Sequence, residues 1–196
     1  HKFDEPNLYK TVAKGGKNCL NGKHANTTIP KFLGALKRYV VLEQTGELTK
    51  DDEVYLTNVE KFFDIAVTRH AYITGGVSVM EHFRKDNNQD GTRTQTNCES
   101  CCAHNMLKMA KELYKVTGDK KYADYYETTL RNSIMGAVKS ESGAAAYFIP
   151  MATGYFKTFG NEDPAKNMFW CLPYLSQSCY LFVCSVFFVF SICLIV

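Results

Sequence analysis

The pattern that most constrains the fold is a helical hairpin that occurs twice along the chain. Apolar residues at helical spacing predict helices over residues 30–44, 51–68, 100–116 and 119–134. Thr45 and Gly46 end the first helix of one pair, Thr117 and Gly118 end that of the other, and Thr28 is expected to cap the first helix. Such repeats need neighbours to bury their faces, so two hairpins predict a mainly α, partial fold.

A long irregular segment separates the two predicted hairpins. Gly75 and Gly76, followed by the polar run 85–95, predict a loop, and residues 144–149 predict a short strand closed by Pro150. Long loops on a rigid helical scaffold are where sites are usually built. The loop between the hairpins is therefore the first region to examine for chemistry.

Composition limits the class of partner. The 196 residues suffice for one domain with a core, and the net charge of +3 is spread over mixed signs without a basic stripe. Nucleic acid is therefore excluded as an expected partner. No charged segment followed by an apolar one comes after His1, so no signal peptide is expected in this sequence.

The end of the chain differs abruptly from the rest. The 23 Lys and Arg and the 20 Asp and Glu residues all lie before Leu172, whereas residues 179–196 form an uncharged stretch long enough to cross a bilayer. Two interpretations stay open: a C-terminal membrane anchor, or translated non-coding sequence appended to a truncated domain. The absence of Lys or Arg after the stretch favours the second. We expect one domain over residues 1–171 and an apolar tail over residues 172–196.

Three cysteines cluster between the hairpins. Cys98, Cys101 and Cys102 lie within five positions, and an odd number of cysteines before the tail does not suggest a disulfide framework. A metal or reactive-thiol site fits this clustering, and free buried cysteines are the alternative. Glu99 and Cys101, two apart at a helix start, could face one ion, but zinc prefers four ligands and Cys171 is the natural source of a third.

Two further residues are candidates for chemistry. His24 precedes the first predicted helix and is either a capping or core residue or a catalytic one. Glu81 lies between apolar neighbours in the long loop, where a partly apolar pocket would suit a general acid; a solvated loop glutamate is the alternative. Asn26 begins an N-glycosylation motif, but no glycan is expected so close to His24.

These motifs, in this order, resemble the glycoside hydrolase family of β-L-arabinofuranosidases. The matching stretches are residues 22–30 (GKHANTTIP), 74–83 (TGGVSVMEHF), 99–108 (ESCCAHNMLK), 122–132 (YADYYETTLRN), 147–150 (YFIP) and 169–171 (FWC). Each stretch alone is a weak signal, and the ordered combination is specific. The resemblance implies a mainly α fold with a few short strands, forming part of an (α/α)6 barrel of the six-hairpin glycosidase type.

The resemblance also implies roles for the residues that match the family's motifs. Glu81 matches the acid/base glutamate, and Cys171 matches a cysteine nucleophile. Glu99, Cys101 and Cys171 match three ligands of a zinc ion, and Leu172 stands where the family has the fourth, a cysteine. Loss of one thiolate should weaken zinc binding greatly, so we expect the chain as written to be inactive or nearly so.

Two more positions match residues that contact the sugar, and these are His24 and Tyr147. Cys102 lies outside the implied set, and we expect it to point away from the ion as a packing residue. The implied reaction is retaining cleavage of non-reducing-end β-L-arabinofuranosides in plant cell-wall glycans or glycoproteins. A related sugar, or a non-catalytic sugar-binding relative tethered to a membrane by the tail, are the alternatives. A full-length relative is expected outside the cell or in the cell wall, and a genuine tail would place the chain at a membrane.

Overall fold

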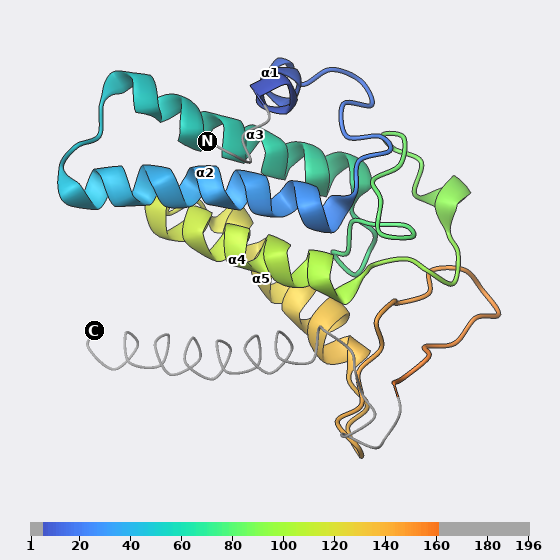
Figure 1. Ribbon diagram of the computed structural model, residues 1–196. Helices are drawn as coiled ribbons and strands as arrows, with labels where there is room; N and C mark the ends of the chain where they lie inside the picture. The colour runs from blue at the N-terminus through green and yellow to red at the C-terminus, as the bar shows by residue number, and fades with distance from the viewer. Residues whose placement is uncertain (1–5, 161–196) are drawn as a thin grey trace.

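Two helical hairpins form the body of the structure, a computed structural model that describes residues 6–160 (Figure 1). The helices are α1 (Pro6–Lys14), α2 (Ala25–Thr45), α3 (Glu53–His70), α4 (Ser100–Thr117) and α5 (Lys120–Thr129). The shorter helical turns are η1 (Lys50–Asp52), η2 (Asp90–Thr92), η3 (Leu130–Ile134) and η4 (Met135–Ala137). Helix α2 packs against both α3 and α4, so the two hairpins lie side by side, as their repeated sequence pattern predicts.

Both predicted glycine stops are confirmed. Gly46 and Gly118 adopt left-handed backbone, with φ of 72° and 68°, directly after α2 and α4. The backbone N–H of each glycine donates back to a carbonyl of the last helical turn, on Glu43 and Tyr114 respectively. Glycine adopts this conformation without the steric cost that a Cβ brings, which is why it ends each of these helices.

The predicted start of the first helix is wrong. Helix α2 begins at Ala25, its N-cap position is His24, and Thr28 is a buried residue of the first turn rather than a cap. The N–H of Ala25 donates to the carbonyl of Glu81 at 2.7 Å, so the long loop fixes where the helix begins. Pro30 lies inside the helix on an exposed face, where its missing N–H leaves the carbonyl of Asn26 without the usual helical donor.

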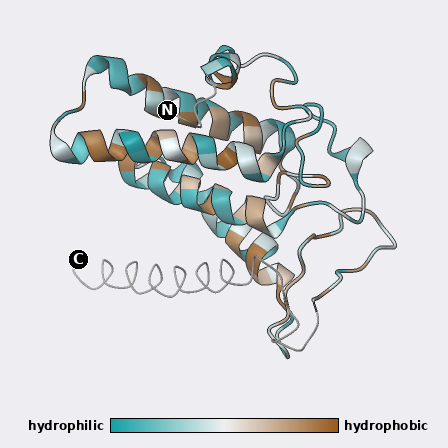
Figure 2. Ribbon diagram, viewed as in Figure 1, coloured by the Kyte–Doolittle hydropathy of each residue, from teal (hydrophilic) through white to brown (hydrophobic). Residues whose placement is uncertain are grey.

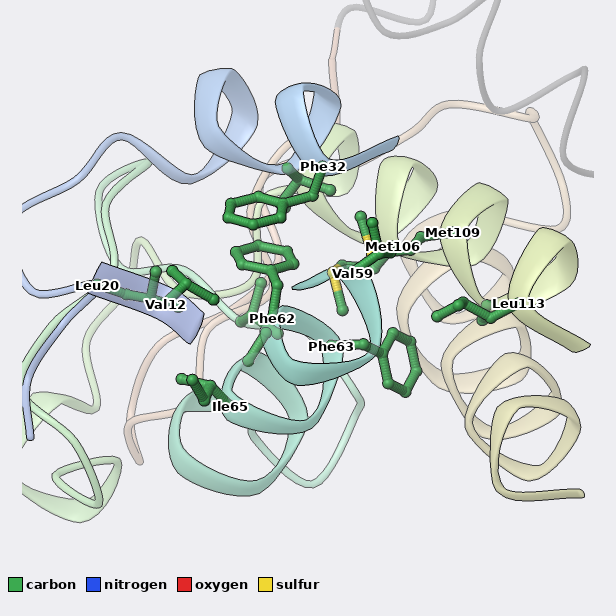
Figure 3. Close-up of a cluster of buried hydrophobic side chains, with 14 of the residues drawn as sticks. Val12, Leu20, Phe32, Val59, Phe62, Phe63, Ile65, Met106, Met109 and Leu113 are labelled. Carbon is green, nitrogen blue, oxygen red and sulfur yellow. The ribbon is translucent and has the colours of Figure 1, made fainter. Parts of the chain in front are cut away.

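The core joins both hairpins and the loop between them (Figure 3). Phe32 of α2 stacks on Phe62 of α3 with ring centroids 4.1 Å apart, and Phe83 from the loop meets Phe62 edge-on. On the other face of α3, Phe63 packs edge-on against Tyr122 of α5 at 5.0 Å. Aromatic pairs in these geometries add about 0.5–1.5 kcal/mol each to the area they bury. Figure 2 shows hydrophobic and hydrophilic residues alternating along α2 and α4, as expected for amphipathic helices.

The loops gather at the end of the body where α2 and α4 begin (Figure 1). Within residues 6–160 the chain forms only isolated β-bridges, including one between Ala146 and Phe159. The strand predicted over residues 144–149 is therefore wrong for the described part, because no neighbouring segment continues the pairing. None of the helices described is long and apolar enough to span a membrane. The predicted tail, residues 172–196, lies outside the described residues.

Candidate active site

Glu81 lies in a tight turn with unusual backbone. Val79 and His82 pair across the turn, with N–H to O=C distances of 3.0 and 3.1 Å. The two central residues, Met80 and Glu81, have φ of 46° and 64°. Two-residue hairpin loops of type I′ use positive φ at both central positions, but normally with Asn and Gly. Left-handed backbone costs other residues roughly 1–2 kcal/mol each, and such strain clusters at functional sites.

The structure brings three of the predicted site residues together around this turn. Nε2 of His24 lies 3.5 Å from Oε2 of Glu81, and the Tyr147 hydroxyl lies 2.8 Å from Oε1 of the same carboxylate. The side chains of His24 and Glu81 are 35% and 41% exposed, so a ligand can reach both. The three residues come from the start of α2, the long loop and the segment after η4.

A second carboxylate lies behind the first. Glu99 occupies the N-cap position of α4 and is only 1% exposed, and its Oε1 lies 2.8 Å from the hydroxyl of Tyr147. Burial raises the pKa of Glu99, and hydrogen bonds from Cys102 and Tyr147 oppose that shift. Burial and the two neighbouring carboxylates raise the pKa of Tyr147, which therefore stays a hydroxyl donor. One tyrosine thus links the exposed Glu81 to the buried Glu99.

Ser78 holds the two carboxylate-bearing segments in register. Its carbonyl accepts the N–H of Cys98 at 2.8 Å, and its hydroxyl accepts the N–H of Glu99 at 3.1 Å. The N–H of Ser100 donates to the carbonyl of Tyr147 at 2.9 Å, which ties the tyrosine to the same helix start. Ser78 is fully buried, and its role was missed from the sequence because a serine within a loop motif gives no signal of its partners.

The expectation that Cys102 points away from the metal-ligand candidates is wrong. Its thiol is fully buried and donates to Oε2 of Glu99 at 3.2 Å. The two residues are three apart at the start of α4, a spacing that places side chains on one face of a helix. Cys102 therefore belongs to the surroundings of Glu99 in the described structure.

The described residues supply at most part of a metal site. Residues 6–160 contain no group of three or more His, Cys, Asp or Glu side chains arranged to hold a metal ion. Glu99 has suitable donor chemistry, since it is a buried carboxylate with no Lys or Arg in ion pair among the described residues. Cys101, two positions later, is disulfide-bonded in this structure and can offer a thiolate only when that bond is reduced. Cys171, the predicted nucleophile and third ligand, lies outside the described residues, as does Leu172.

Two side chains that sequence reasoning did not assign to the site also contact it. The imidazole of His82 lies against that of His24, with ring centroids 4.9 Å apart. Asn105 on α4 donates its side-chain N–H to the side-chain oxygen of Asn26 on α2 at 2.8 Å, which ties the starts of the two helices together.

A separate hollow lies on the outer side of the body. A groove of about 840 Å³ runs between α1, α2 and α3, with Tyr9, Gly34, Arg38 and Tyr55 among its lining residues. None of the predicted site residues between positions 6 and 160 lines it. The candidate site is instead the group of side chains around Glu81, close to the N-termini of α2 and α4. The positive ends of both helix dipoles favour an anionic group there.

Solved structures of glycosidases share this fold. A structure described as a glycoside hydrolase matches with a TM-score of 0.60 and 19% identity over 80% of this chain and 28% of its own. A GH127 β-arabinofuranosidase matches with a TM-score of 0.58 and 24% identity, over 79% of this chain and 23% of its own. A GH127 β-L-arabinofuranosidase from Geobacillus stearothermophilus T6 matches with a TM-score of 0.52 and 21% identity, over 65% and 19%. The chain thus spans less than a third of each of these proteins.

The comparison with protein families gives the assignment. No curated protein matches the chain. The family described as the GH127 catalytic domain of β-L-arabinofuranosidases matches residues 1–180, a stretch that includes Cys171 and Leu172. Its members and the matched structures are glycosidases with (α/α)6-type catalytic domains, and the mainly helical hairpins described above fit a portion of such a barrel. The chain therefore belongs to the GH127 β-L-arabinofuranosidase family and represents part of its catalytic domain.

Proposed function

We propose that this chain derives from a retaining glycosidase that cleaves non-reducing-end β-L-arabinofuranosides, and that it retains the sugar-recognition half of the site. The observation that carries the proposal is the convergence of His24 and Tyr147 on the exposed carboxylate of Glu81. A carboxyl group flanked by an imidazole and a hydroxyl offers the donors and acceptors that furanose hydroxyls require.

Glu81 is proposed as the general acid and base. In the first step the thiolate of Cys171 attacks the anomeric carbon, the glycosidic C–O bond breaks, and Glu81 donates its proton to the departing oxygen. In the second step Glu81 takes a proton from water as that water attacks the anomeric carbon and releases the thiolate. Two inversions at one carbon give net retention. Tyr147 and His24 hold the Glu81 carboxyl from two sides throughout.

Glu99, Cys101 and Cys171 are proposed as zinc ligands of the reduced chain, in which Cys101 is no longer in a disulfide. A zinc ion held by them would keep the Cys171 thiol deprotonated at neutral pH. Glu99 would then serve the metal rather than the sugar, in keeping with its burial behind Tyr147. The substrates proposed from the family are L-arabinofuranose-containing glycans or glycoproteins of the plant cell wall, and a related sugar remains the alternative within the same fold.

Because of Leu172, we propose that the chain as written does not hydrolyse arabinofuranosides. An apolar side chain stands where the family's fourth ligand is expected, so the thiolate of Cys171 is poorly activated. This residue also favours the second candidate function, a non-catalytic relative that binds arabinofuranosides. Tethering of that relative to a membrane rests on residues 172–196, outside the described part.

Hydrolysis of an aryl β-L-arabinofuranoside by the full chain with zinc tests the proposal. We expect no turnover by the natural chain and measurable turnover by Leu172→Cys. The matched control is Leu172→Cys combined with Glu81→Gln, which should return the rate to background because the acid/base group is lost. Robust turnover by the natural chain would contradict the proposed inactivity, and turnover that survives Glu81→Gln would remove Glu81 from the mechanism.

A further inference from the structure

The turn that carries Glu81 has hydrogen bonds on three successive carbonyls. The carbonyl of Val79 accepts the backbone N–H of His82 at 3.1 Å. The carbonyl of Met80 lies 2.6 Å from Nδ1 of the His82 imidazole, and the carbonyl of Glu81 accepts the N–H of Ala25 at 2.7 Å. The turn is therefore held by its own backbone, by the start of α2 and by one side chain, that of His82.

Such support is needed because the turn has no glycine. Met80 and Glu81 both have positive φ, and two consecutive non-glycine residues keep that conformation only where their surroundings hold it. Met80 is largely exposed, so packing of its side chain contributes little. The bond from His82 to the Met80 carbonyl acts directly on the peptide that precedes Glu81, and so on the direction in which Glu81 leaves the backbone.

The same imidazole also contacts the second residue of the site. The rings of His82 and His24 lie 4.9 Å apart at 60°, and Nε2 of His24 faces the Glu81 carboxylate at 3.5 Å. The backbones of His24 and His82 form an antiparallel bridge, which fixes the separation of the two rings. His82 therefore contacts both the turn that carries Glu81 and the imidazole that faces its carboxylate.

We propose that His82 is a positioning residue, whose imidazole as the Nδ1–H tautomer fixes the direction of Glu81 and the ring of His24. The functional part of this inference rests on the proposed sugar-binding role of Glu81 and His24. The structural part, the tautomer of His82, does not rest on that role. It follows from the contact with the Met80 carbonyl, because a carbonyl oxygen can only accept a hydrogen bond. Nδ1 of His82 must then carry the proton, and in the neutral ring Nε2 is left as the acceptor.

The tautomer can be measured without reference to function. Long-range ¹H–¹⁵N correlation spectra of the uniformly ¹⁵N-labelled full chain, in mildly alkaline solution where imidazole is neutral, distinguish the two tautomers of each of the five histidines. The His82 signals are those missing from the spectrum of His82→Asn. We expect the Nδ1–H tautomer at His82. The Nε2–H tautomer there would overturn the proposal, whether or not the chain binds sugar.

Two variants of matched purpose test the positioning role. In His82→Asn the side-chain amide can still donate to the Met80 carbonyl, whereas His82→Phe keeps a ring against His24 and removes the donor. We expect the affinity for methyl β-L-arabinofuranoside to fall about 10-fold in His82→Phe, the effect of one lost hydrogen bond. It should stay within about 3-fold of the natural chain in His82→Asn and in the exposed loop control Lys85→Ala.

The outcomes separate the two proposals. Equal affinity in His82→Phe and the natural chain, with matching melting temperatures, would overturn the positioning role. If the natural chain does not bind the probe at all, the proposed function fails, and the tautomer of His82 alone then decides the inference about the turn. If His82→Phe does not fold, the tautomer measurement decides it.

Discussion

The hydroxyl of Tyr147 lies 2.8 Å from a carboxylate oxygen of Glu81. It lies equally close to an oxygen of the buried Glu99, so a single side chain bridges the exposed and the buried carboxylate. Because a hydroxyl carries one proton, Tyr147 donates a hydrogen bond to one carboxylate at a time. Both carboxyl groups can bond to the hydroxyl together when one of them carries a proton and donates it. The exposed acid and the residue proposed to serve the metal are thereby coupled.

Replacing Tyr147 with Phe should lower the free energy of unfolding by about 1–3 kcal/mol. The variant keeps the ring beside Phe148 but leaves Glu99 buried with one donor fewer, and bonds to charged groups are worth about that much. Urea unfolding followed by circular dichroism measures the difference. Tyr155→Phe, at an exposed tyrosine, is the matched control and should change stability by less than about 0.5 kcal/mol. Equal effects of the two variants would contradict the bridging role.

Two glycine substitutions should have opposite effects. A Cβ at Gly76 would lie 2.7 Å from the sulfur and 3.0 Å from the Cα of Cys98, the residue before Glu99. Gly76→Ala should therefore destabilise the chain by about 1–3 kcal/mol. Gly34→Ala, inside α2 with nothing within 4 Å of the added carbon, should stabilise it by about 0.5–1 kcal/mol. Thermal unfolding of both variants checks the signs, and a tolerated Gly76→Ala would show that the loop does not constrain Cys98.

The chain should lose stability as the pH falls, because His104 is buried in its neutral form. Burial, followed by the nearby charge of Lys108, lowers the pKa of His104 to about 4 from an ordinary 6.5. Between these values the unfolded chain binds a proton at this site that the folded chain does not, so acid favours unfolding. The natural chain should lose up to about 3 kcal/mol more than His104→Gln between pH 7 and pH 4. Parallel stability curves for the two proteins would contradict this.

Zinc affinity should depend on the residue at position 172. The proposed ligand set has three members in the natural chain, and Leu172→Cys would supply the fourth. We expect Leu172→Cys to tighten zinc binding by at least about 10-fold, and Glu99→Gln to weaken it by a similar factor. Competition with a chromophoric chelator measures both. If neither substitution changes zinc affinity, the proposed ligand set is wrong.

The helices were predictable from the sequence because their signals are local. Apolar spacing and the left-handed glycines Gly46 and Gly118 place α3, α4 and the end of α2 to within about two residues. The start of α2 was not predictable, since a hydrogen bond from Ala25 to Glu81 in a distant loop sets it. Helix α1, packed against α3, was not predicted either.

The candidate site was predictable as a set of residues but not as a geometry. The ordered motifs single out His24, Glu81, Glu99 and Tyr147, and the structure brings these four together. The turn at Glu81 has no sequence signature, because two-residue hairpins usually contain Asn and Gly. The contact between Cys102 and Glu99 depends on burial of both side chains, which spacing alone does not give.

Binding of methyl β-L-arabinofuranoside to the natural chain, measured by titration calorimetry or ligand-observed NMR, tests the central claim most directly. The account predicts a dissociation constant of about 1 mM or tighter for the β-L-furanoside. It also predicts weakening by about 10-fold in His24→Ala and no detectable binding of a methyl D-galactopyranoside. No binding of the furanoside, or equal binding of both sugars by a folded chain, would contradict the assignment of the group around Glu81 as an arabinofuranoside site.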